Sequence, residues 1–265
     1  MKNNIRVRLV SFVVLVAASI PLAAGSAGAQ QARIAQVADS SIPQTSGAAP
    51  VNLPSLTADQ VVARLVEANA RRARELKSYT GKRAYSLDYH GFPGHKEANL
   101  VVNAQYNAPA TKQFNVISES GSKVVQNKVL KKLLESEKEA ADPENQRRTA
   151  LSPENYNFTL LGTAPSAHGG CYRLHVDPHK DNKFLYRGEI CVNAADFAVE
   201  SIDAEPSKNP SFWISNTKIV HRYQKVGDFW LPASNKSVTK VRLGGTAILT
   251  IQYTDYQVTA ANAAH

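Results

Sequence analysis

The chain has 265 residues, carries 31 Lys and Arg against 22 Asp and Glu, and has a formal net charge of +9 at pH 7. This length fits one large domain or two small ones. The basic residues are scattered, and no run of Lys or Arg exceeds two, which speaks against a nucleic-acid-binding protein. The charge favours a solvated basic surface, and a weak attraction to anionic membranes or ligands is the alternative.

The N-terminus has the pattern of a secretory signal peptide over residues 1–29. Basic residues lie within the first eight positions, and residues 9–22 are apolar. Ala27 and Ala29 then form the A-x-A pattern that signal peptidase recognises, so we expect cleavage after Ala29. The alternative is an uncleaved membrane anchor, but the apolar stretch is shorter than the roughly 20 residues that a span needs. The sequence therefore predicts an exported protein.

A helix is expected to follow a disordered linker. Residues 30–54 are rich in Ala, Ser, Gln and Pro and lack hydrophobic periodicity, as is typical of a disordered segment. Thr57-Ala58-Asp59-Gln60 has the form of a capping box, which marks the first turn of a helix. Apolar residues at helical spacing follow it, so an amphipathic helix should extend to about Ser78.

The rest of the chain alternates between strand patterns and one further helix. The helix is expected over Ser122–Ala141, where Asp142-Pro143 should stop it. The expected strands are Tyr79–Tyr89, Ala98–Tyr106, Phe114–Ser118, Tyr156–Leu161, Cys171–Val176, Phe184–Val192, Ala198–Ala204, Lys218–Val226, Phe229–Leu243 and Ala247–Gln257. Short turns such as Gly227-Asp228 and Gly244-Gly245 join antiparallel neighbours.

These elements predict an α+β domain over residues 55–259, followed by a tail over 260–265. About 9–11 antiparallel strands should form one sheet, and a strongly twisted sheet of this size tends to curl. The two main helices are expected to cover its concave face. If they fit loosely, an apolar cavity remains for a ligand.

Cys171 and Cys191 are expected to form a structural disulfide, because disulfides persist in exported proteins. Alternating runs flank a polar turn between them, which is typical of a β-hairpin. A hairpin symmetric about Asp181 would place Cys171 opposite Cys191 and Arg173 opposite Glu189. The alternative is a redox pair, but the close C-x-x-C spacing is absent.

Several short motifs occur in the order found in a known family. They are Leu76-Lys77-Ser78-Tyr79-Thr80-Gly81, Asn107-Ala108-Pro109, Lys112–Val116, Gly121-Ser122-Lys123, Val226–Pro232 and Tyr253-Thr254-Asp255-Tyr256. Over residues 55–258 the chain resembles the LolA-like superfamily of periplasmic outer-membrane lipoprotein-sorting and carrier proteins. The resemblance implies an incomplete, curved antiparallel β-barrel whose helices cover an apolar cavity for acyl chains. The lipoprotein carriers have a basic residue before the Pro of the x-x-Pro turn, whereas this chain has Asn107-Ala108 before Pro109.

The resemblance implies a periplasmic, non-catalytic carrier of acyl chains that serves outer-membrane lipoprotein sorting or lipid transport. We expect a monomer whose cargo is a lipid or lipoprotein and whose transient partners are donor or acceptor membrane proteins. The residues expected to contact the acyl chain are Val62, Leu65, Val66, Leu100, Val102, Phe114, Val116, Val129 and Leu133. The alternative is a protein-binding sensor of the cell envelope on the same scaffold.

Catalytic motifs are absent from the sequence, so we predict neither an enzyme nor a cofactor. There is no G-x-S-x-G, H-E-x-x-H or P-loop pattern. Two turns contain histidines and are expected to be exposed, with a metal site as the less favoured alternative. One turn contains His90 and His95, and the other contains His175, Asp177 and His179. The carboxylates at Asp196, Glu200, Asp203 and Glu205 are expected on a solvated strand face rather than in a glycosidase cleft.

Overall fold

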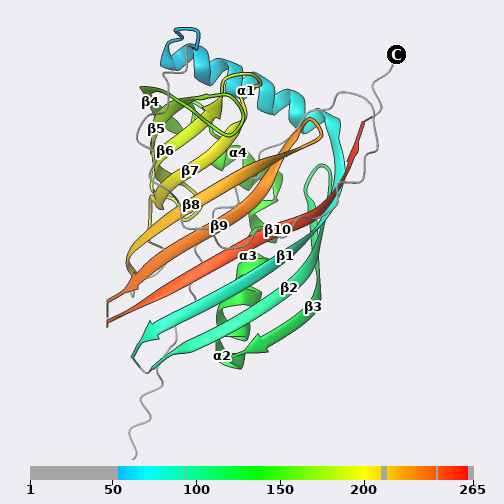
Figure 1. Cartoon of the computed structure of the whole chain (residues 1–265), viewed down its shortest axis with the longest axis vertical. Helices are drawn as coiled ribbons and strands as arrows, with labels where there is room; N and C mark the ends of the chain where they lie inside the picture. Colours follow the sequence, from blue (N-terminus) through cyan, green and yellow to red (C-terminus); the bar gives the residue numbers. More distant parts are fainter. Residues whose placement is uncertain (1–52, 93, 210–213, 243, 262–265) are drawn as a thin grey trace, which may run out of the picture.

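The computed structural model describes residues 53–92, 94–209, 214–242 and 244–261. These residues form one ten-stranded antiparallel sheet with helices on one face and across one end (Figure 1). The α+β fold with a curved, incomplete barrel is therefore confirmed. The predicted signal peptide lies outside the described residues, as does the linker up to residue 52.

The sheet follows the chain almost in sequence. Its strands are β1 (Leu76–Gly91), β2 (Lys96–Asn107), β3 (Thr111–Gly121), β4 (Tyr156–Ala164), β5 (Cys171–Pro178), β6 (Tyr186–Asn193), β7 (Val199–Pro206), β8 (Ile214–Val226), β9 (Phe229–Val241) and β10 (Gly245–Ala260). Their spatial order is β3-β2-β1-β10-β9-β8-β7-β6-β5-β4. Each of the ten predicted strands is present, and most of them are longer than predicted.

The barrel is open between β3 and β4, which are the two edge strands. The first strand pairs with the last, β1 with β10, so the opening falls in the middle of the chain. The segment that joins β3 to β4 is helical: α2 (Lys123–Val125), the π-helical turn η1 (Gln126–Leu130), α3 (Lys131–Ala140) and α4 (Pro143–Thr149). The open side of the barrel is thus connected by helices rather than by a strand.

The first helix, α1 (Ala58–Glu75), begins where the sequence predicted. The Thr57 side chain accepts a hydrogen bond from the Gln60 amide, and the Gln60 side-chain oxygen accepts one from the Thr57 amide, which is the predicted capping box. The helix ends three residues earlier than predicted, because Leu76 already belongs to β1. Leu76 fits both the helical and the strand periodicity, so the sequence alone did not show at which residue the helix ends and the strand begins.

The second predicted helix is present as the continuous run α2, η1 and α3, with Ser122 as its cap. Asp142-Pro143 ends it, but these two residues also start α4, which was not predicted. The Asp142 carboxylate accepts hydrogen bonds from the amides of Glu144 and Asn145, and Pro143 occupies the first turn. A Pro preceded by Asp is both a stop signal and a favourable helix start.

The Cys171–Cys191 disulfide is present, with the two Cα atoms 5.5 Å apart. The predicted hairpin register was wrong by two residues, because Cys171 lies opposite Asn193 and Arg173 lies opposite Cys191. Arg173 and Glu189 still form an ion pair at 2.6 Å. A shift of two residues keeps every side chain on its face, so the disulfide and the ion pair form diagonally.

Two large apolar clusters form the core. One packs Val61, Val62 and Leu65 of α1 against the strands from β4 to β9. The other packs the helices between β3 and β4 against β1, β2 and β10, with Leu130 and Leu133 fully buried. Each helical layer thus covers its own half of the sheet. None of the helices in the described ranges is long and apolar enough to cross a membrane.

Candidate functional site

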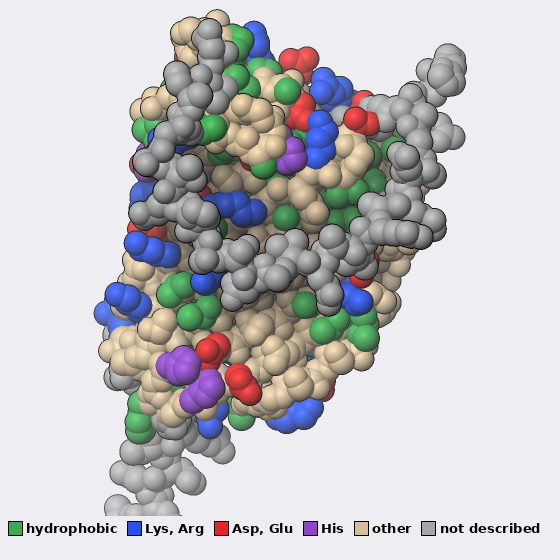
Figure 2. Space-filling model, viewed as in Figure 1, with side chains coloured by type: hydrophobic (Ala, Val, Ile, Leu, Met, Phe, Trp, Pro, Cys, Tyr) green, Lys and Arg blue, Asp and Glu red, His purple; other side chains and the backbone are tan. Residues whose placement is uncertain are grey.

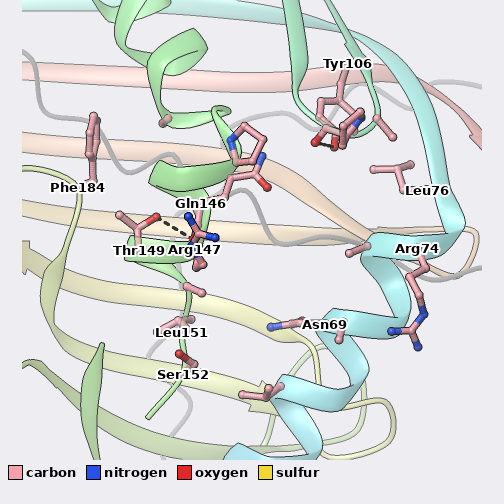
Figure 3. A pocket seen from close by; sticks show the side chains of 18 of the residues that line it. Asn69, Arg74, Leu76, Tyr106, Gln146, Arg147, Thr149, Leu151, Ser152 and Phe184 are labelled. Carbon is pink, nitrogen blue, oxygen red and sulfur yellow. Dashed lines mark hydrogen bonds between the residues drawn. The ribbon is translucent and has the colours of Figure 1, made fainter. Parts of the chain in front are cut away.

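A groove of about 740 Å³ lies between the two helical layers. One wall is the C-terminal half of α1, and the opposite wall is α4 with the segment that follows it. The turn between β2 and β3 and the residues Phe184 and Tyr186 complete the lining. Figure 3 shows α1 and the α4 side on opposite sides of this space, with Asn69 extending into it from α1. This volume falls within the range of small-molecule sites, roughly 300–1,000 Å³.

The floor of the groove is apolar. Leu76, Ala140, Leu151 and Tyr186 line it and are buried. The partly buried side chains of Val66, Tyr106 and Phe184 and the small side chains of Ala70 and Ala73 extend the apolar surface toward the rim. Binding of an apolar ligand to a surface of this kind is favourable, because it removes apolar groups of both the ligand and the protein from water.

The rim of the groove is cationic. Arg74, Lys77 and Arg147 line it and are exposed. Among the described residues that line the groove, none is Asp or Glu. The groove therefore combines an apolar floor with a positive rim, which suits a ligand with an apolar body and an anionic end.

The α1 wall is fixed to the rest of the protein by a buried arginine. Arg72 is 2% exposed and donates hydrogen bonds to the main-chain oxygens of Asp196 and Phe197. It also pairs with the Asp196 carboxylate at 3.5 Å. Lys225 and Trp230 donate to the same carboxylate at 2.9 and 2.8 Å. Burial would raise the pKa of the Asp196 carboxyl, but these donors outweigh it and lower that pKa, so the anion that anchors α1 stays charged.

The turn after β2 is held against the start of β1. The Ala108 amide donates to the Lys77 main-chain oxygen at 2.8 Å, and the Tyr106 hydroxyl donates to the Pro109 oxygen at 2.8 Å. Ala108-Pro109 is a cis peptide bond. The x-x-Pro turn identified in the sequence therefore forms part of the groove. Lys77, from the beginning of β1, lines the groove together with this turn, which has no basic residue of its own.

The buried Tyr186 side chain has a hydroxyl group without a hydrogen-bond partner among the described residues. Burial raises the pKa of this phenol well above its ordinary value, so the group stays protonated and can donate a hydrogen bond. A buried hydroxyl without a partner is costly in a folded protein. Tyr186 lines the groove, but its hydroxyl oxygen is itself shielded from solvent.

The nine residues predicted to contact an acyl chain fall into different parts of the molecule. Val66 lines the groove. Val62 and Leu65 belong to the α1 cluster, and Leu100, Val102, Val129 and Leu133 are buried in the cluster on the other half of the sheet, with Phe114 packed against it. Val116 is 50% exposed on the edge strand β3.

The sequence reasoning did not select the cations of the rim. Arg74 follows Val66 and Ala70 at intervals of four residues, so helical spacing places these three on one face of α1. That signal was available. Arg147 lies on α4, which was not predicted, and its place in the groove depends on contacts distant in the sequence.

A charged cluster is buried in the half of the protein that contains α3. Arg83 and Glu137, 2% and 6% exposed, form an ion pair, and Lys112 lies 3.5 Å from the same carboxylate. The Tyr85 hydroxyl donates to Glu137 at 2.9 Å. Burial would raise the pKa of the Glu137 carboxyl, but Arg83, Lys112 and the Tyr85 hydrogen bond together lower it. The cluster is therefore charged at neutral pH.

The remaining candidate residues have structural partners. Among the carboxylates considered for catalysis, Asp196 anchors α1, Asp203 pairs with Arg222, and Glu205 accepts from Asn216. The expectation of a solvated face was wrong for Glu200, which is 7% exposed and accepts hydrogen bonds from Ser166 and Asn193. Near the second His-containing turn, Asp177 pairs with Arg187, and His179 contacts Asn157. His90 and His95 instead come together around Asp88.

Comparisons with known proteins give matches only at the level of structure. No protein-family model matches the chain, and no curated protein matches it. A crystal structure of a DUF1329 family protein from Desulfovibrio piger is 13% identical and covers 79% of this chain and 96% of its own, with a TM-score of 0.38.

Two further solved structures are similar to this chain at comparable levels of sequence identity. A LolA superfamily protein from Nitrosomonas europaea is 12% identical, covers 77% of this chain and 94% of its own, and has a TM-score of 0.31. A putative outer membrane lipoprotein-sorting protein domain from Vibrio parahaemolyticus is 11% identical, covers 76% of this chain and 94% of its own, and has a TM-score of 0.34.

Proposed function

We propose that this protein is a non-catalytic periplasmic carrier that binds the acyl chain of a lipid or lipoprotein in the groove between α1 and α4. The observation that carries the proposal is the combination of an apolar floor with three rim cations and no carboxylate among the described lining residues. Donor and acceptor membrane proteins would be its transient partners.

An apolar groove is sufficient to hold an acyl chain. Each methylene removed from water contributes about 0.8 kcal/mol, so a chain gains affinity in proportion to the length that the groove covers. Of the nine predicted wall residues, Val66 would contact the ligand directly. The other eight are not among the residues that line the groove, so this proposal does not place them in contact with the ligand.

The rim would bind the polar end of the ligand. Arg74, Lys77 and Arg147 are exposed, so each would add only about 0.2–1 kcal/mol in attraction to an anion. The apolar floor would therefore supply most of the affinity, and the rim would set the orientation and the preference for anionic over neutral ligands.

The test is a titration with a fluorescent fatty acid, using two tryptophan substitutions on α1. Ala73 lines the groove, whereas Ala63 is also exposed on α1 but lies outside the lining. Ala73→Trp would place an indole where the chain lies. Displacing two methylenes would cost about 1.6 kcal/mol, or about 15-fold in affinity. Ala63→Trp should bind like the wild type. Equal affinities for both variants, or no binding by the wild type, would contradict the proposal.

The rim has its own matched pair, Arg147 and Arg148. Arg147 lines the groove, while its neighbour Arg148 pairs with Glu144. Arg147→Gln should weaken binding of a fatty acid two- to fivefold, corresponding to about 0.4–1 kcal/mol, and leave binding of the matching fatty alcohol unchanged. Arg148→Gln should change neither. If both arginine variants behaved alike, the rim would have no part in recognition.

A second candidate function, a protein-binding sensor, is favoured by the edge strand β3. Val116 and Ile117 are 50% and 51% exposed there, and an edge strand offers unpaired main-chain groups to a partner strand. If this function applies, Val116→Glu should abolish co-purification of an inner-membrane protein and leave fatty-acid binding intact. Under the carrier proposal, the substitution should change neither.

A further inference from the structure

Three potential metal ligands converge at the far end of the β1–β2 hairpin. His90 Nε2 lies 3.0 Å from one oxygen of Asp88, and His95 Nε2 lies 2.7 Å from the other. The three ligand atoms all lie within 4.8 Å of one another. The side chains of His90, His95 and Asp88 are 63%, 51% and 43% exposed, so an ion from solution can reach them. Figure 2 shows histidine and acidic side chains together at the end of the molecule where Figure 1 places this turn.

The strand geometry explains why these residues meet. Asp88 and His90 are two residues apart on β1, so their side chains lie on the same face. Antiparallel pairing places Asp88 opposite Glu97 and Tyr89 opposite Lys96. Continued by one residue, this register places His95 opposite His90. The two imidazole rings are stacked, with centroids 4.4 Å apart and planes 6° apart.

The same register places a second carboxylate on this face of the hairpin, next to the group of three. Glu97 lies directly opposite Asp88, and paired residues on antiparallel strands project from the same face. Glu97 is exposed. Two imidazoles and two carboxylates thus share one face of the hairpin end, which is the donor set that Zn²⁺ and Cu²⁺ accept in proteins.

We propose that Asp88, His90 and His95 bind one divalent transition-metal ion such as Zn²⁺ or Cu²⁺, with Glu97 as the fourth ligand. Both Nε2 atoms already face the Asp88 carboxylate, each toward one of its two oxygens. The metal replaces the protons that these nitrogens share with the carboxylate. This site is independent of the acyl-chain groove, since none of its residues lines that groove.

Only small movements of the Asp88, His90 and His95 side chains are needed to fit an ion among them. Glu97 lies outside this group of three and has to rotate toward the ion. Ligands at about 2.1 Å from a tetrahedral Zn²⁺ are about 3.4 Å apart. The present separations of 3.0 and 2.7 Å are therefore too short by roughly half an ångström or slightly more. Rotation of exposed side chains provides this without a change in the backbone. A bound ion would connect β1 to β2 beyond the turn and hold the end of the hairpin.

The test uses the full-length protein without a polyhistidine tag, titrated with Zn²⁺ in a calorimeter. The wild type should bind one ion per chain. His90→Gln/His95→Gln should weaken binding by more than about 100-fold, because even groups that only support a metal ligand contribute 10- to 100-fold. Asp88→Asn should weaken it by at least about tenfold. His179→Gln removes an exposed histidine at a different turn and should bind like the wild type.

A second readout separates a metal site from a hydrogen-bonded turn. With Cu²⁺ as the probe, electron paramagnetic resonance of the wild type should show two nitrogen ligands, and Asp88→Asn should retain both. Saturating Zn²⁺ should raise the unfolding temperature of the wild type but not that of the double histidine variant. The proposal is overturned if the wild type binds no Zn²⁺, or if the double variant binds it as tightly as the wild type. In the first case, the three side chains act only as hydrogen-bonding partners at the hairpin end.

Discussion

Removing the negative charge of Glu137 should destabilise the protein severely. Glu137 is 6% exposed and is surrounded by Arg83, Lys112 and the Tyr85 hydroxyl. Glu137→Gln keeps the size and shape of the side chain but leaves the guanidinium of Arg83, itself 2% exposed, without a counter-charge. Breaking a buried ion pair in this way costs about 3–5 kcal/mol. For a domain of this size, that loss lowers the unfolding temperature by about 6–20 °C.

Two matched variants test the cause. Glu139 lies two residues further along α3 and pairs with Lys183, with the two side chains 48% and 45% exposed. Glu139→Gln should therefore cost no more than about 1 kcal/mol. Lys112, whose side chain is 7% exposed, faces the same carboxylate, so all three charged groups have to be replaced together. Arg83→Met/Lys112→Met/Glu137→Leu should recover most of the stability that Glu137→Gln loses, because no charge of this cluster then remains buried and unpaired.

The pH dependence gives an independent check on the same pair. The lowered pKa of Glu137 means that its ionisation stabilises the folded state above the unfolded pKa, near 4.3, and that this stabilisation disappears as the pH falls through the folded pKa. The deficit of Glu137→Gln, measured by urea unfolding, should therefore be full at pH 7 and shrink in acid. If Glu137→Gln lost no more stability than Glu139→Gln at pH 7, the argument from the buried charge would be wrong.

Two further stability predictions concern the disulfide and a buried histidine. Cys171 and Cys191 are separated by 20 residues in the sequence. Reduction, or a Cys171→Ser/Cys191→Ser variant, should therefore cost about 3 kcal/mol and lower the calorimetric unfolding temperature by about 6–12 °C. An unchanged temperature would mean that the disulfide does not restrict the conformations of the unfolded chain. Burial lowers the pKa of His221 to about 3, whereas the unfolded chain titrates near 6.5. Between these values the unfolded state binds one more proton, so the free energy of unfolding should fall by up to about 1.4 kcal/mol for each unit of decreasing pH. His221→Asn should lose this part of the slope between pH 6 and 5 in urea titrations, and an identical slope would show that His221 titrates normally.

Local signals predicted most of the fold. The capping box at Thr57 and the alternation in the strands depend on near neighbours in the chain, and both led to the correct elements. The disulfide was also predicted, because a two-residue error in register keeps both cysteines on one face. The helix α4 was missed because Asp142-Pro143 was interpreted as an end and not also as a beginning.

The candidate sites were less accessible from the sequence. The groove depends on α4 and on Tyr186, which approach α1 only through the order of strands in the sheet. The Arg83–Glu137 pair joins residues 54 positions apart, and no local pattern indicates that relation. The pairing of His90 with His95 was within reach, since both flank one predicted turn, but the contribution of Asp88 required the strand register.

The carrier proposal is tested most directly by native mass spectrometry with lipid extraction on the mature protein, purified gently from a periplasm. We expect an added mass that is released as phospholipid or another acyl species, and we expect Ala73→Trp to carry less of it than Ala63→Trp. A mass corresponding to the bare chain, together with no uptake of a fluorescent fatty acid, would contradict the proposal that the groove holds an acyl chain.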